Sequence, residues 1–268
     1  MLKIVSLRNP KIKQAVKLRG KRERDRTRSF LIEGYRELSR AVKGGVSLVS
    51  LFYSPDHFLG SHESALIREI REQGVEAFEV HQRVFEKISY RDRPDGLLAV
   101  AMQTRLTLRQ LDRKISHQRS PFLVVAEAIE KPGNLGSILR SADATGVDAL
   151  LVCDRCTDIY NPNVIRASVG TLFTVPVLEV TSEEAIEWLK KWRIEIVATS
   201  PDADETFTAA DLAGPIALAI GTEQLGLSEK WIEASDLQVR IPMHGIADSL
   251  NVAAATTLLL YEIRRQRP

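Results

Sequence analysis

Short apolar runs alternate with helix-like segments from residue 121 to the end of the chain. The runs are rich in Val, Ile, Leu and Ala, as is typical of strands buried on both faces of a parallel sheet. They cover 121–128, 147–152, 173–180, 194–200, 215–221 and 237–242. Apolar residues recur near helical spacing over 134–146, 182–192, 228–235 and 250–266. This alternation predicts an α/β domain with a parallel sheet over 119–268, with ligands beyond the carboxyl ends of its strands.

Residues 1–104 show the same alternation in shorter segments and predict a second, smaller α/β domain. A strand followed by a helix is predicted over 30–45, and helices also over 62–74 and 81–89. Further strands are predicted over 46–54, 75–80 and 96–103. Residues 105–118 are polar, charged and weakly periodic, which indicates an inter-domain linker with some helical character.

Charge is distributed unevenly along a chain whose formal net charge is +2. Residues 1–50 contain 14 Lys and Arg against 4 Asp and Glu, whereas the rest of the chain has an acidic excess. Most of this basic charge lies in 11–30. Such a tract predicts a surface that neutralises nucleic-acid phosphates, with a solvated helix face as the alternative. The candidate contacts are Lys11, Lys13, Lys17, Arg19, Lys21 and Arg22.

The composition, 44% hydrophobic and 27% charged, is typical of a soluble globular protein. No apolar run approaches the ~20 residues that cross a bilayer, and the first residues lack the apolar stretch of a secretory signal. A cytoplasmic location without a membrane partner is therefore expected. Cys153 and Cys156 form a C-x-x-C pair, but neither a redox pair nor a zinc site is supported by further ligands at suitable spacing. We interpret them as two small residues at a strand end and expect no metal.

Candidate chemistry begins in the loop EKPGNLGSILR, where Gly133 and Gly136 bracket Asn134 and Arg140 follows on a helix. A dinucleotide-binding turn, with Asp154 as the ribose ligand, is one hypothesis, but the close-approach glycine of G-x-G-x-x-G is missing. Asn134 is also a suitable helix N-cap. An arginine on a largely apolar helix favours the interpretation that Asn134 and Arg140 face one cleft.

Two later loops also place polar side chains at the end of a predicted strand or the start of a predicted helix. Gly221 ends a strand and Glu223 lies in the turn after it, where a carboxylate can orient a ligand or remain a solvated turn residue. The segment IPMHGIADSLN leads into the last helix. Ser249 and Asn251 can cap that helix, and unpaired backbone amides at a helix entrance attract polar ligand groups.

Taken together, the three loops resemble motifs of the SpoU (TrmH) family of RNA ribose 2′-O-methyltransferases, within the SPOUT superfamily. The matching pieces are N-x-G-x-x-x-R at 134–140, G-x-E-x-x-G-L at 221–227 and I-P-M…S-L-N-V at 241–252. More loosely, the front half resembles the small substrate-binding domain of many members, which is similar to a ribosomal-protein fold that binds bent RNA. FLIEGYRELSRAV is the best match there.

The resemblance implies a deep trefoil knot in the C-terminal domain, a homodimer formed through that domain, and S-adenosylmethionine as cofactor. By motif position, the cofactor loops contain Thr199, Ser200, Gly221, Ile241, Met243 and Leu250. Arg140 becomes the main catalytic group. Asn134, Glu223, Ser249 and Asn251 shape the pocket and orient it. Arg166 lies in an R-x-S-x-G piece and is a candidate RNA contact, or equally a structural ion-pair partner.

The activity implied is S-adenosylmethionine-dependent 2′-O-methylation of a ribose in RNA. Large-subunit ribosomal RNA is favoured over transfer RNA, because members that act on transfer RNA often lack the front domain. A catalytically silent RNA-binding protein of the same fold is an alternative. Since the pKa of a guanidinium lies above ~12, Arg140 is expected to position the ribose hydroxyl and a phosphate rather than abstract the proton.

Overall fold

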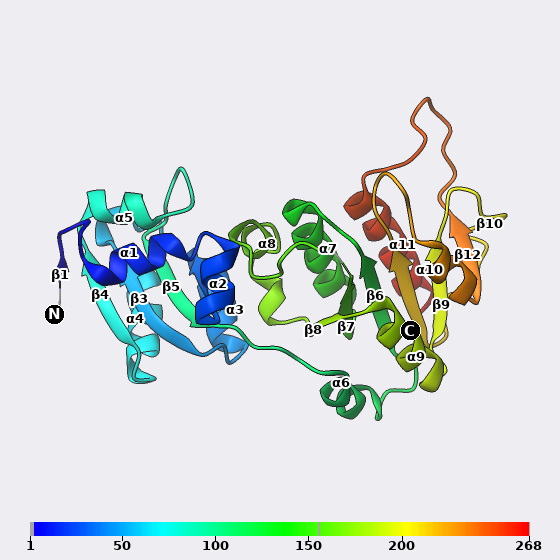
Figure 1. Ribbon diagram of the computed structural model, residues 1–268, viewed down its shortest axis with the longest axis horizontal. Helices are drawn as coiled ribbons and strands as arrows, with labels where there is room; N and C mark the ends of the chain where they lie inside the picture. Colours follow the sequence, from blue (N-terminus) through cyan, green and yellow to red (C-terminus); the bar gives the residue numbers. More distant parts are fainter. Residues whose placement is uncertain (1–2, 155, 268) are drawn as a thin grey trace. The chain divides into compact units, whose positions relative to one another are not determined.

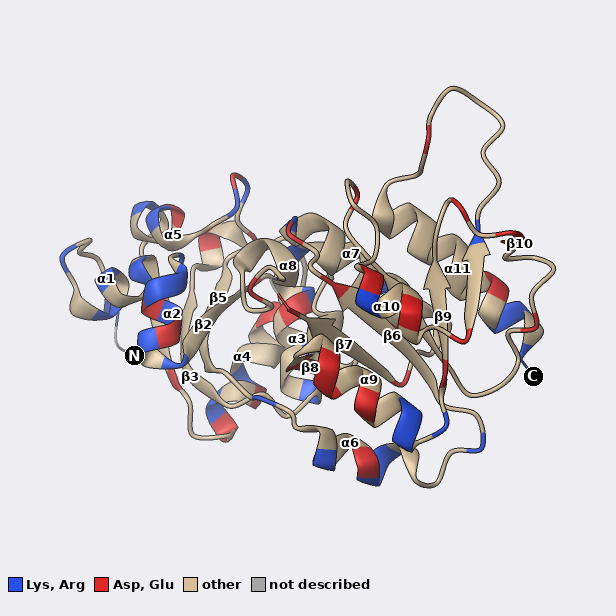
Figure 2. Ribbon diagram, turned by 45° about the vertical axis from the view of Figure 1, so that its right-hand side comes forward, with Lys and Arg blue, Asp and Glu red and all other residues tan. Residues whose placement is uncertain are grey.

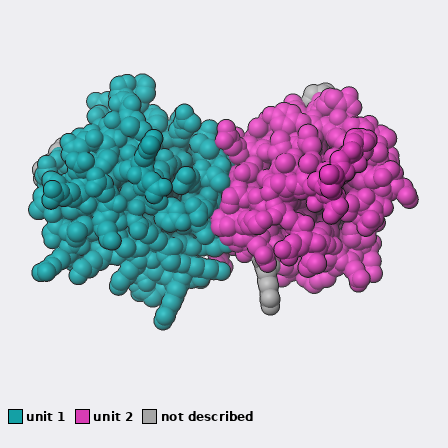
Figure 3. All heavy atoms as spheres, turned by 90° about the horizontal axis from the view of Figure 1, so that it is seen from above, with its two compact units in different colours: residues 1–104, 158–174 teal, residues 105–157, 175–268 magenta. Residues whose placement is uncertain are grey.

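The computed structural model describes residues 3–154 and 156–267 (Figure 1). Residues up to Thr104 pack together with Asp158–Thr174 into one compact unit, unit 1. Unit 2 comprises Arg105–Thr157 and the chain from Val175 onward. Figure 3 colours the two units teal and magenta. Each unit is therefore assembled from two separate stretches of the sequence.

Unit 1 is built on a five-stranded mixed sheet with the order β1-β4-β3-β5-β2. β5 runs antiparallel to both β2 and β3, and the other pairs are parallel. The strands are β1 (Lys3–Ile4), β2 (Ser29–Glu33), β3 (Leu48–Tyr53), β4 (Glu76–Val80) and β5 (Leu97–Met102). The helices are α1 (Pro10–Lys17), α2 (Lys21–Thr27), α3 (Tyr35–Lys43), α4 (Glu63–Glu72), α5 (Gln82–Ile88) and α8 (Pro162–Ala167), with 3-10 turns η1 (Pro55–His57) and η2 (Thr171–Phe173). The predicted alternation of strands and helices is confirmed.

Local sequence explains how the basic tract forms a helix on this sheet. Asn9 caps α1, since its Oδ1 accepts from the Lys11 N–H at 2.9 Å, and Pro10 occupies the first turn, where an amide hydrogen is not needed. Ile12 is 1% exposed and packs in a core that contains Phe78 of β4. The apolar side of α1 is therefore buried, while its basic residues face outward.

Asp158–Thr174 lies between two strands of unit 2 in sequence, yet it folds as part of unit 1. Arg24, 2% exposed, forms an ion pair with Asp158 at 2.6 Å. The ring of Tyr160 lies 4.5 Å from that of Phe30. Leaving a buried guanidinium without its carboxylate is strongly destabilising, so the ion pair holds the segment against α2. The predicted boundary at 104 omits this segment, because its attachment depends on partners about 130 residues apart in sequence.

Unit 2 contains a seven-stranded, fully parallel sheet with the order β10-β12-β9-β11-β6-β7-β8. The strands are β6 (Phe122–Glu127), β7 (Ala149–Cys153), β8 (Val177–Val180), β9 (Glu195–Thr199), β10 (Glu205–Thr206), β11 (Ile216–Ile220) and β12 (Leu237–Arg240). The helices are α6 (Leu108–Ile115), α7 (Pro132–Thr145), α9 (Ser182–Lys191), α10 (Glu229–Ala234) and α11 (Val252–Gln266). The predicted parallel sheet is confirmed, and every residue of β6, β7 and β11 is buried.

The strand order contradicts the dinucleotide-binding hypothesis for the turn before α7. In a Rossmann sheet the first and fourth strands are neighbours, because the order is 3-2-1-4-5-6. Here β11, the sixth strand of the unit, lies between β6 and β9, the first and fourth. Gly133 and Gly136, which lie within the first turns of α7, therefore belong to a different parallel-sheet topology.

Helices α6, α9 and α10 cover one face of the unit 2 sheet. Leu111 of α6 packs in the same core as Trp188 of α9. Asp112 accepts from the indole N–H groups of Trp188 and Trp192 at 2.7 and 2.8 Å. The segment predicted as a linker, 105–118, thus contains a helix that packs within unit 2. Separately, α7 packs against α11, and α11 contacts β11.

The two helices that carry motif residues begin near their predicted positions. α7 starts at Pro132, so Asn134 lies within its first turn and Lys131, not Asn134, is the N-cap residue. α11 starts at Val252, and the capping role predicted for Asn251 is confirmed, since its Oδ1 accepts from the Ala253 N–H at 3.1 Å.

Cys153, the last residue of β7, is buried, and Cys156, in the loop that follows, is half-buried. Burial raises the pKa of both thiols, that of Cys156 to about 12, so both are protonated at neutral pH. The thiolate is the form that binds metals and exchanges disulfides, so this environment opposes the zinc and redox hypotheses. Within residues 3–154 and 156–267 there is no cluster of three or more His, Cys, Asp and Glu suited to a metal. The same residues contain no helix long and apolar enough to span a membrane.

Candidate active site

The order of the strands brings the predicted cofactor loops together. All strands of the unit 2 sheet are parallel, so their carboxyl ends lie at one edge. Thr199 and Ser200 come at the end of β9, Gly221 follows β11, and Ile241 follows β12. Because β9 lies between β11 and β12, these three loops are neighbours. Ligands of open parallel sheets bind at this edge.

A hydrogen-bonded cluster around Glu223 joins residues from three loops. Asn134 Nδ2 donates to Glu223 Oε1 at 2.9 Å. Asn251 Nδ2 donates to the same oxygen and, at 3.2 Å, to Asn134 Oδ1. Lys131 Nζ forms an ion pair with Glu223 Oε2. The structure thus brings together Asn134, Glu223 and Asn251, which the sequence singled out separately, and adds Lys131.

Electrostatics keeps Glu223 ionised. Hydrogen bonds from Lys131 and then Asn134 lower the pKa of the Glu223 carboxyl below its usual value. An ionised carboxylate only accepts hydrogen bonds, so it directs the NH₂ groups of both asparagines toward itself. The Oδ1 of Asn251 is consequently turned to the N-terminus of α11, where it caps the helix. Glu223 therefore orients both amides and fastens the starts of α7 and α11 to one loop.

Gly221 is required by the turn that carries Glu223. A Cβ at Gly221 would lie only 2.0 Å from the carbonyl oxygen of Gly226. The turn is closed by backbone hydrogen bonds between Thr222 and Gly226 of 2.9 and 3.1 Å, and Gly226 has a φ of 66°. Gly221 is therefore needed because a Cβ there would come too close to the Gly226 carbonyl. Gly226 is needed because its φ is positive, a conformation that glycine adopts without strain.

A second carboxylate, Glu127, anchors the other end of this loop. Glu127 ends β6, is 6% exposed, and accepts from the Ser228 N–H at 2.8 Å and its hydroxyl at 2.6 Å. Ser228 is the N-cap residue of α10, but its hydroxyl donates to Glu127 and does not bond to the helix backbone. Sequence reasoning missed this role, although a charged residue at the end of an apolar strand was a signal for it.

The remaining cofactor candidates lie in loops with free backbone groups. Thr199 Oγ1 donates to the carbonyl of Ala219 at 3.2 Å and links β9 to β11. Residues 241–251 form a long loop that extends away from the sheet between β12 and α11 (Figure 1). In the part of the chain that the structure describes, the N–H groups of Ile241, Met243 and Leu250 have no hydrogen-bond partner. Such donors fit a nucleoside-like cofactor that is recognised through the backbone.

Arg140 and Ser249 do not join the Glu223 cluster. Both side chains are exposed, and neither forms a hydrogen bond or ion pair with any described residue. Asn134 and Arg140 both belong to α7, so their six-residue separation turns them about 120° apart around the helix. They therefore leave α7 on adjoining sides. The guanidinium of Arg140 is free to contact a substrate.

The basic tract forms α1 and α2, where blue ribbon is concentrated in Figure 2. Lys11 pairs with Glu76 at 2.8 Å, and Arg19 donates to the carbonyls of Lys87 and Ser89. These two residues hold α1 in place within unit 1. The candidates that are exposed, with no ion pair to another described residue, are Lys13, Lys17, Lys21, Arg22 and Arg166.

Neutralising two exposed lysines of the tract tests its contact with RNA. Lys17→Gln/Lys21→Gln is expected to weaken RNA binding and to reduce the slope of log K against log salt by about 1.5, because each lost phosphate contact removes ~0.7–0.9. Fluorescence anisotropy between low and moderate salt measures both effects. Lys190→Gln/Lys191→Gln on α9 is the matched control. An unchanged slope in the α1–α2 variant would identify the tract as a solvated surface.

Comparisons with known proteins agree with this geometry. Residues 121–261 match the SpoU rRNA Methylase family, and residues 9–99 match the MRM3-like substrate binding domain. The chain is 36% identical over 272 residues to the 23S rRNA (uridine(2479)-2′-O)-methyltransferase of Streptomyces viridochromogenes, covering 98% of this chain and 92% of the relative.

Two solved structures resemble the whole chain. The crystal structure of an RNA 2′-O ribose methyltransferase aligns with a TM-score of 0.86 and 40% identity, covering 99% of each chain. The AdoMet-bound rRNA methyltransferase of Sinorhizobium meliloti aligns with a TM-score of 0.88 and 31% identity, covering 98% of this chain and 97% of that one. From its motif loops, its parallel sheet and these relatives, the chain belongs to the SpoU rRNA methylase family.

Proposed function

We propose that the Glu223 cluster and the neighbouring loops form the site at which this protein methylates a ribose 2′-hydroxyl of ribosomal RNA. The meeting of Asn134, Glu223 and Asn251 beside the cofactor loops is the observation that carries the proposal. The relatives act on 23S ribosomal RNA, and the front of the chain matches a substrate-binding domain. Large-subunit ribosomal RNA is therefore the favoured substrate, with transfer RNA as the alternative.

S-adenosylmethionine is the cofactor, and when bound it supplies a methyl group made electrophilic by its sulfonium. Thr199, Ser200 and Gly221 hold it from the ends of β9 and β11. The free backbone groups of Ile241, Met243 and Leu250 complete the loops around it. Glu223, through Asn134 and Asn251, keeps the starts of α7 and α11 at a constant separation around this place.

Arg140 positions the ribose hydroxyl and an adjacent phosphate. Its guanidinium carries a permanent charge, so it stabilises developing negative charge on the hydroxyl oxygen better than it removes a proton. Glu223 is also a poor base, because hydrogen bonds from Lys131 and Asn134 lower its pKa. Ser249, which is exposed just before α11, contacts the nucleotide in this proposal. The chain's own contribution is thus mainly alignment for an in-line attack.

Cofactor binding tests this function. Calorimetric titration with S-adenosylmethionine should give saturable binding, and S-adenosylhomocysteine should raise the melting temperature as expected for a ligand of the native state. NAD should leave the melting temperature unchanged. RNA binding without any S-adenosylmethionine binding would instead support the catalytically silent alternative.

The exposed face of α11 supports a homodimer. Leu258 and Tyr261 are 46% and 54% exposed and, with Ala254, form an outward stripe at helical spacing. A second copy packed on this stripe would remove that apolar surface from water. The deep trefoil knot of the C-terminal domain stays a prediction of the family resemblance, as does a cytoplasmic location. Sedimentation measurements on the wild type and on Leu258→Glu test the dimer.

A further inference from the structure

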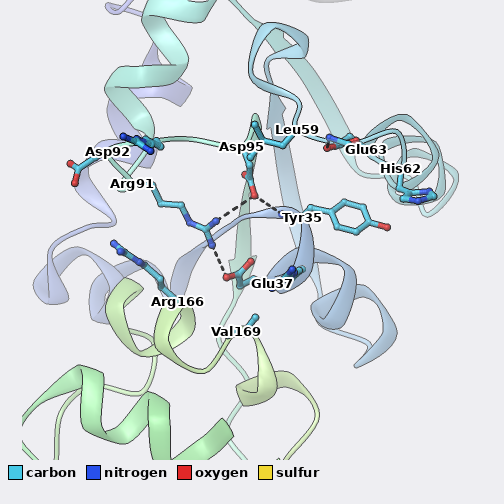
Figure 4. A pocket seen from close by; sticks show the side chains of 13 residues that line it. Tyr35, Glu37, Leu59, His62, Glu63, Arg91, Asp92, Asp95, Arg166 and Val169 are labelled. Carbon is cyan, nitrogen blue, oxygen red and sulfur yellow. Dashed lines mark hydrogen bonds and ion pairs between the residues drawn. The ribbon is translucent and has the colours of Figure 1, made fainter.

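Unit 1 contains a pocket of about 740 Å³ whose function none of the motif loops explains (Figure 4). It is lined by side chains from the start of α3, the segment 59–63, the segment 91–95, and α8 with the turn that follows it. All of these segments belong to unit 1. The volume falls within the ~300–1,000 Å³ typical of small-molecule sites, so the pocket is large enough for one nucleotide.

An ion-pair cluster fixes two of the lining segments to each other. Arg91 pairs with Glu37 at 2.6 Å and with Asp95 at 3.4 Å. Asp95 Oδ2 also accepts from the Tyr35 N–H at 3.0 Å, at the start of α3 (Figure 4). The three charged side chains are between 6% and 20% exposed, so they bond mainly to one another. The cluster therefore gives the pocket its shape, and contacts to a ligand must come from the other lining residues.

The turn after α8 is held tightly against α3. The carbonyl of Val169 accepts from the Arg40 guanidinium, and a Cβ at Gly170 would lie only 2.8 Å from the Cα of Glu37. Val169 has a φ of 53°, which is rare for a β-branched residue. Strained backbone of this kind persists only where its surroundings impose it, and it is frequent at binding sites. The position of Arg166, on α8, is therefore fixed relative to α3.

Three arginines of the lining have free guanidinium groups. Arg36, Arg93 and Arg166 are exposed, and their side chains form no hydrogen bond or ion pair with any described residue. Among the described residues of the lining, Asp92 is the one exposed carboxylate, because the other three carboxylates are buried or half-buried. A ligand thus meets more positive than negative charge, and the planar guanidinium suits a phosphate.

Aromatic and apolar side chains line another part of the pocket. The ring centroids of Tyr35 and His62 lie 6.4 Å apart, and Leu59 beside them is 81% exposed. Figure 4 shows both rings on the side of the pocket opposite Arg166. Unpaired RNA bases stack on such rings. The lining therefore offers a cationic side and an aromatic side, which match the phosphate and the base of a nucleotide.

We propose that this pocket binds one unpaired nucleotide of the RNA substrate, with its base stacked on Tyr35 and its flanking phosphates on Arg93 and Arg166. Stacking does not select a base, because every base has a π face. A base inside a duplex is stacked on both sides and is not available to the ring. The pocket thus recognises an unpaired position. The inference rests on RNA being the substrate, as proposed above, and adds a contact outside the methyl-transfer site.

Two short RNA duplexes that differ in one bulged uridine test the proposal. The full chain is titrated, by fluorescence anisotropy, into each fluorescein-labelled duplex. The bulged duplex is expected to bind about tenfold more tightly, which lies within the range that stacking of one base on an aromatic side chain contributes. A bulged adenosine should give a similar gain. Equal affinities of the wild type for the bulged and the fully paired duplex would overturn the proposal without the need for any variant.

Tyr35→Leu identifies the pocket as the source of the preference. Leucine removes the ring but leaves the backbone N–H that donates to Asp95, so the ion-pair cluster keeps this contact. The preference for the bulged duplex should fall below about twofold, while the affinity for the fully paired duplex is retained. Tyr35→Phe keeps the ring and should keep the preference. A full preference in Tyr35→Leu would contradict stacking in this pocket.

Arg166→Gln tests the phosphate contact. It should weaken binding of the bulged duplex and reduce the slope of log K against log salt by about 0.7, the value for one lost contact to an unpaired strand. Arg68→Gln, an exposed residue of α4 outside the lining, is the control and should change neither. An unchanged slope in Arg166→Gln would contradict the proposed contact.

Calorimetry with S-adenosylmethionine on the same samples separates the two proposals. A preference for the bulge that persists in Tyr35→Leu, with cofactor binding intact, contradicts the pocket and leaves the methyl-transfer function standing. Failure of the wild type to bind the cofactor contradicts the methyl-transfer function, whatever the duplexes show.

Discussion

Arg140→Ala is expected to lower the rate of methyl transfer by at least about 100-fold, the scale typical of removing one electrostatic group from an active site. S-adenosylmethionine affinity should change by less than about twofold, because Arg140 is exposed and forms no hydrogen bond or ion pair with the described residues of the cofactor loops. Single-turnover transfer of a radiolabelled methyl group to ribosomal RNA measures the rate, and calorimetry measures the affinity.

The matched control for Arg140 is Arg109→Ala, which removes another exposed guanidinium from a unit 2 helix. It should leave both the rate and the affinity unchanged. Arg140→Lys keeps the charge but loses the planar fork of donors, so an intermediate rate is expected. A near-normal rate for Arg140→Ala would remove this residue from the mechanism.

Gly221→Ala is expected to abolish most cofactor binding, because it displaces the loop that carries Glu223. The added methyl group would meet the Gly226 carbonyl oxygen at 2.0 Å, so the backbone of the turn must move. Overpacking of this kind costs about 1–3 kcal/mol of unfolding free energy, and the displaced loop should lower S-adenosylmethionine affinity at least about tenfold. Thermal melting and calorimetry on the same preparation measure the two effects.

Gly214→Ala is the control for this substitution. A Cβ at Gly214 meets no atom within 4 Å, so the variant should melt at or above the wild-type temperature and bind the cofactor normally. Wild-type cofactor affinity in Gly221→Ala would show that the turn after β11 is not part of the cofactor site.

The sheet of unit 2 could be predicted because its strands are buried on both faces. β6, β7 and β11 consist of buried residues throughout, so each appears in the sequence as a continuous apolar run. The same parallel arrangement predicts that loops after the strands share one edge. Strand order was beyond prediction from periodicity, because the insertion of β11 between β6 and β9 depends on contacts between distant segments.

The polar cluster could be predicted in part. Asn134, Glu223 and Asn251 stood out because each lies in a glycine-containing or helix-starting loop at a strand end. Lys131 was missed, since its ion pair with Glu223 depends on the reach of a long side chain across 92 residues of sequence. The direction of the Arg140 side chain could not be predicted from the sequence, because it depends on where α7 begins, which is Pro132.

The charge pattern of the sequence did not distinguish Lys and Arg residues that stabilise the fold from those that are free to contact RNA. Arg19 and Lys11 belong to the basic tract, yet both are used to hold α1 in unit 1. Arg24, in the same tract, is buried against Asp158, so one of the densest basic stretches contains a core residue. Such assignments require knowledge of which carboxylates and carbonyls lie opposite each side chain.

The most direct measurement is a map of 2′-O-methylated riboses across ribosomal RNA, made with and without the protein in the presence of S-adenosylmethionine. We expect one additional methylated ribose in large-subunit RNA that depends on the wild-type protein and is missing with Arg140→Ala. Identical maps with and without the wild-type protein, saturated with S-adenosylmethionine, would contradict the assignment of this chain as a ribosomal RNA 2′-O-methyltransferase.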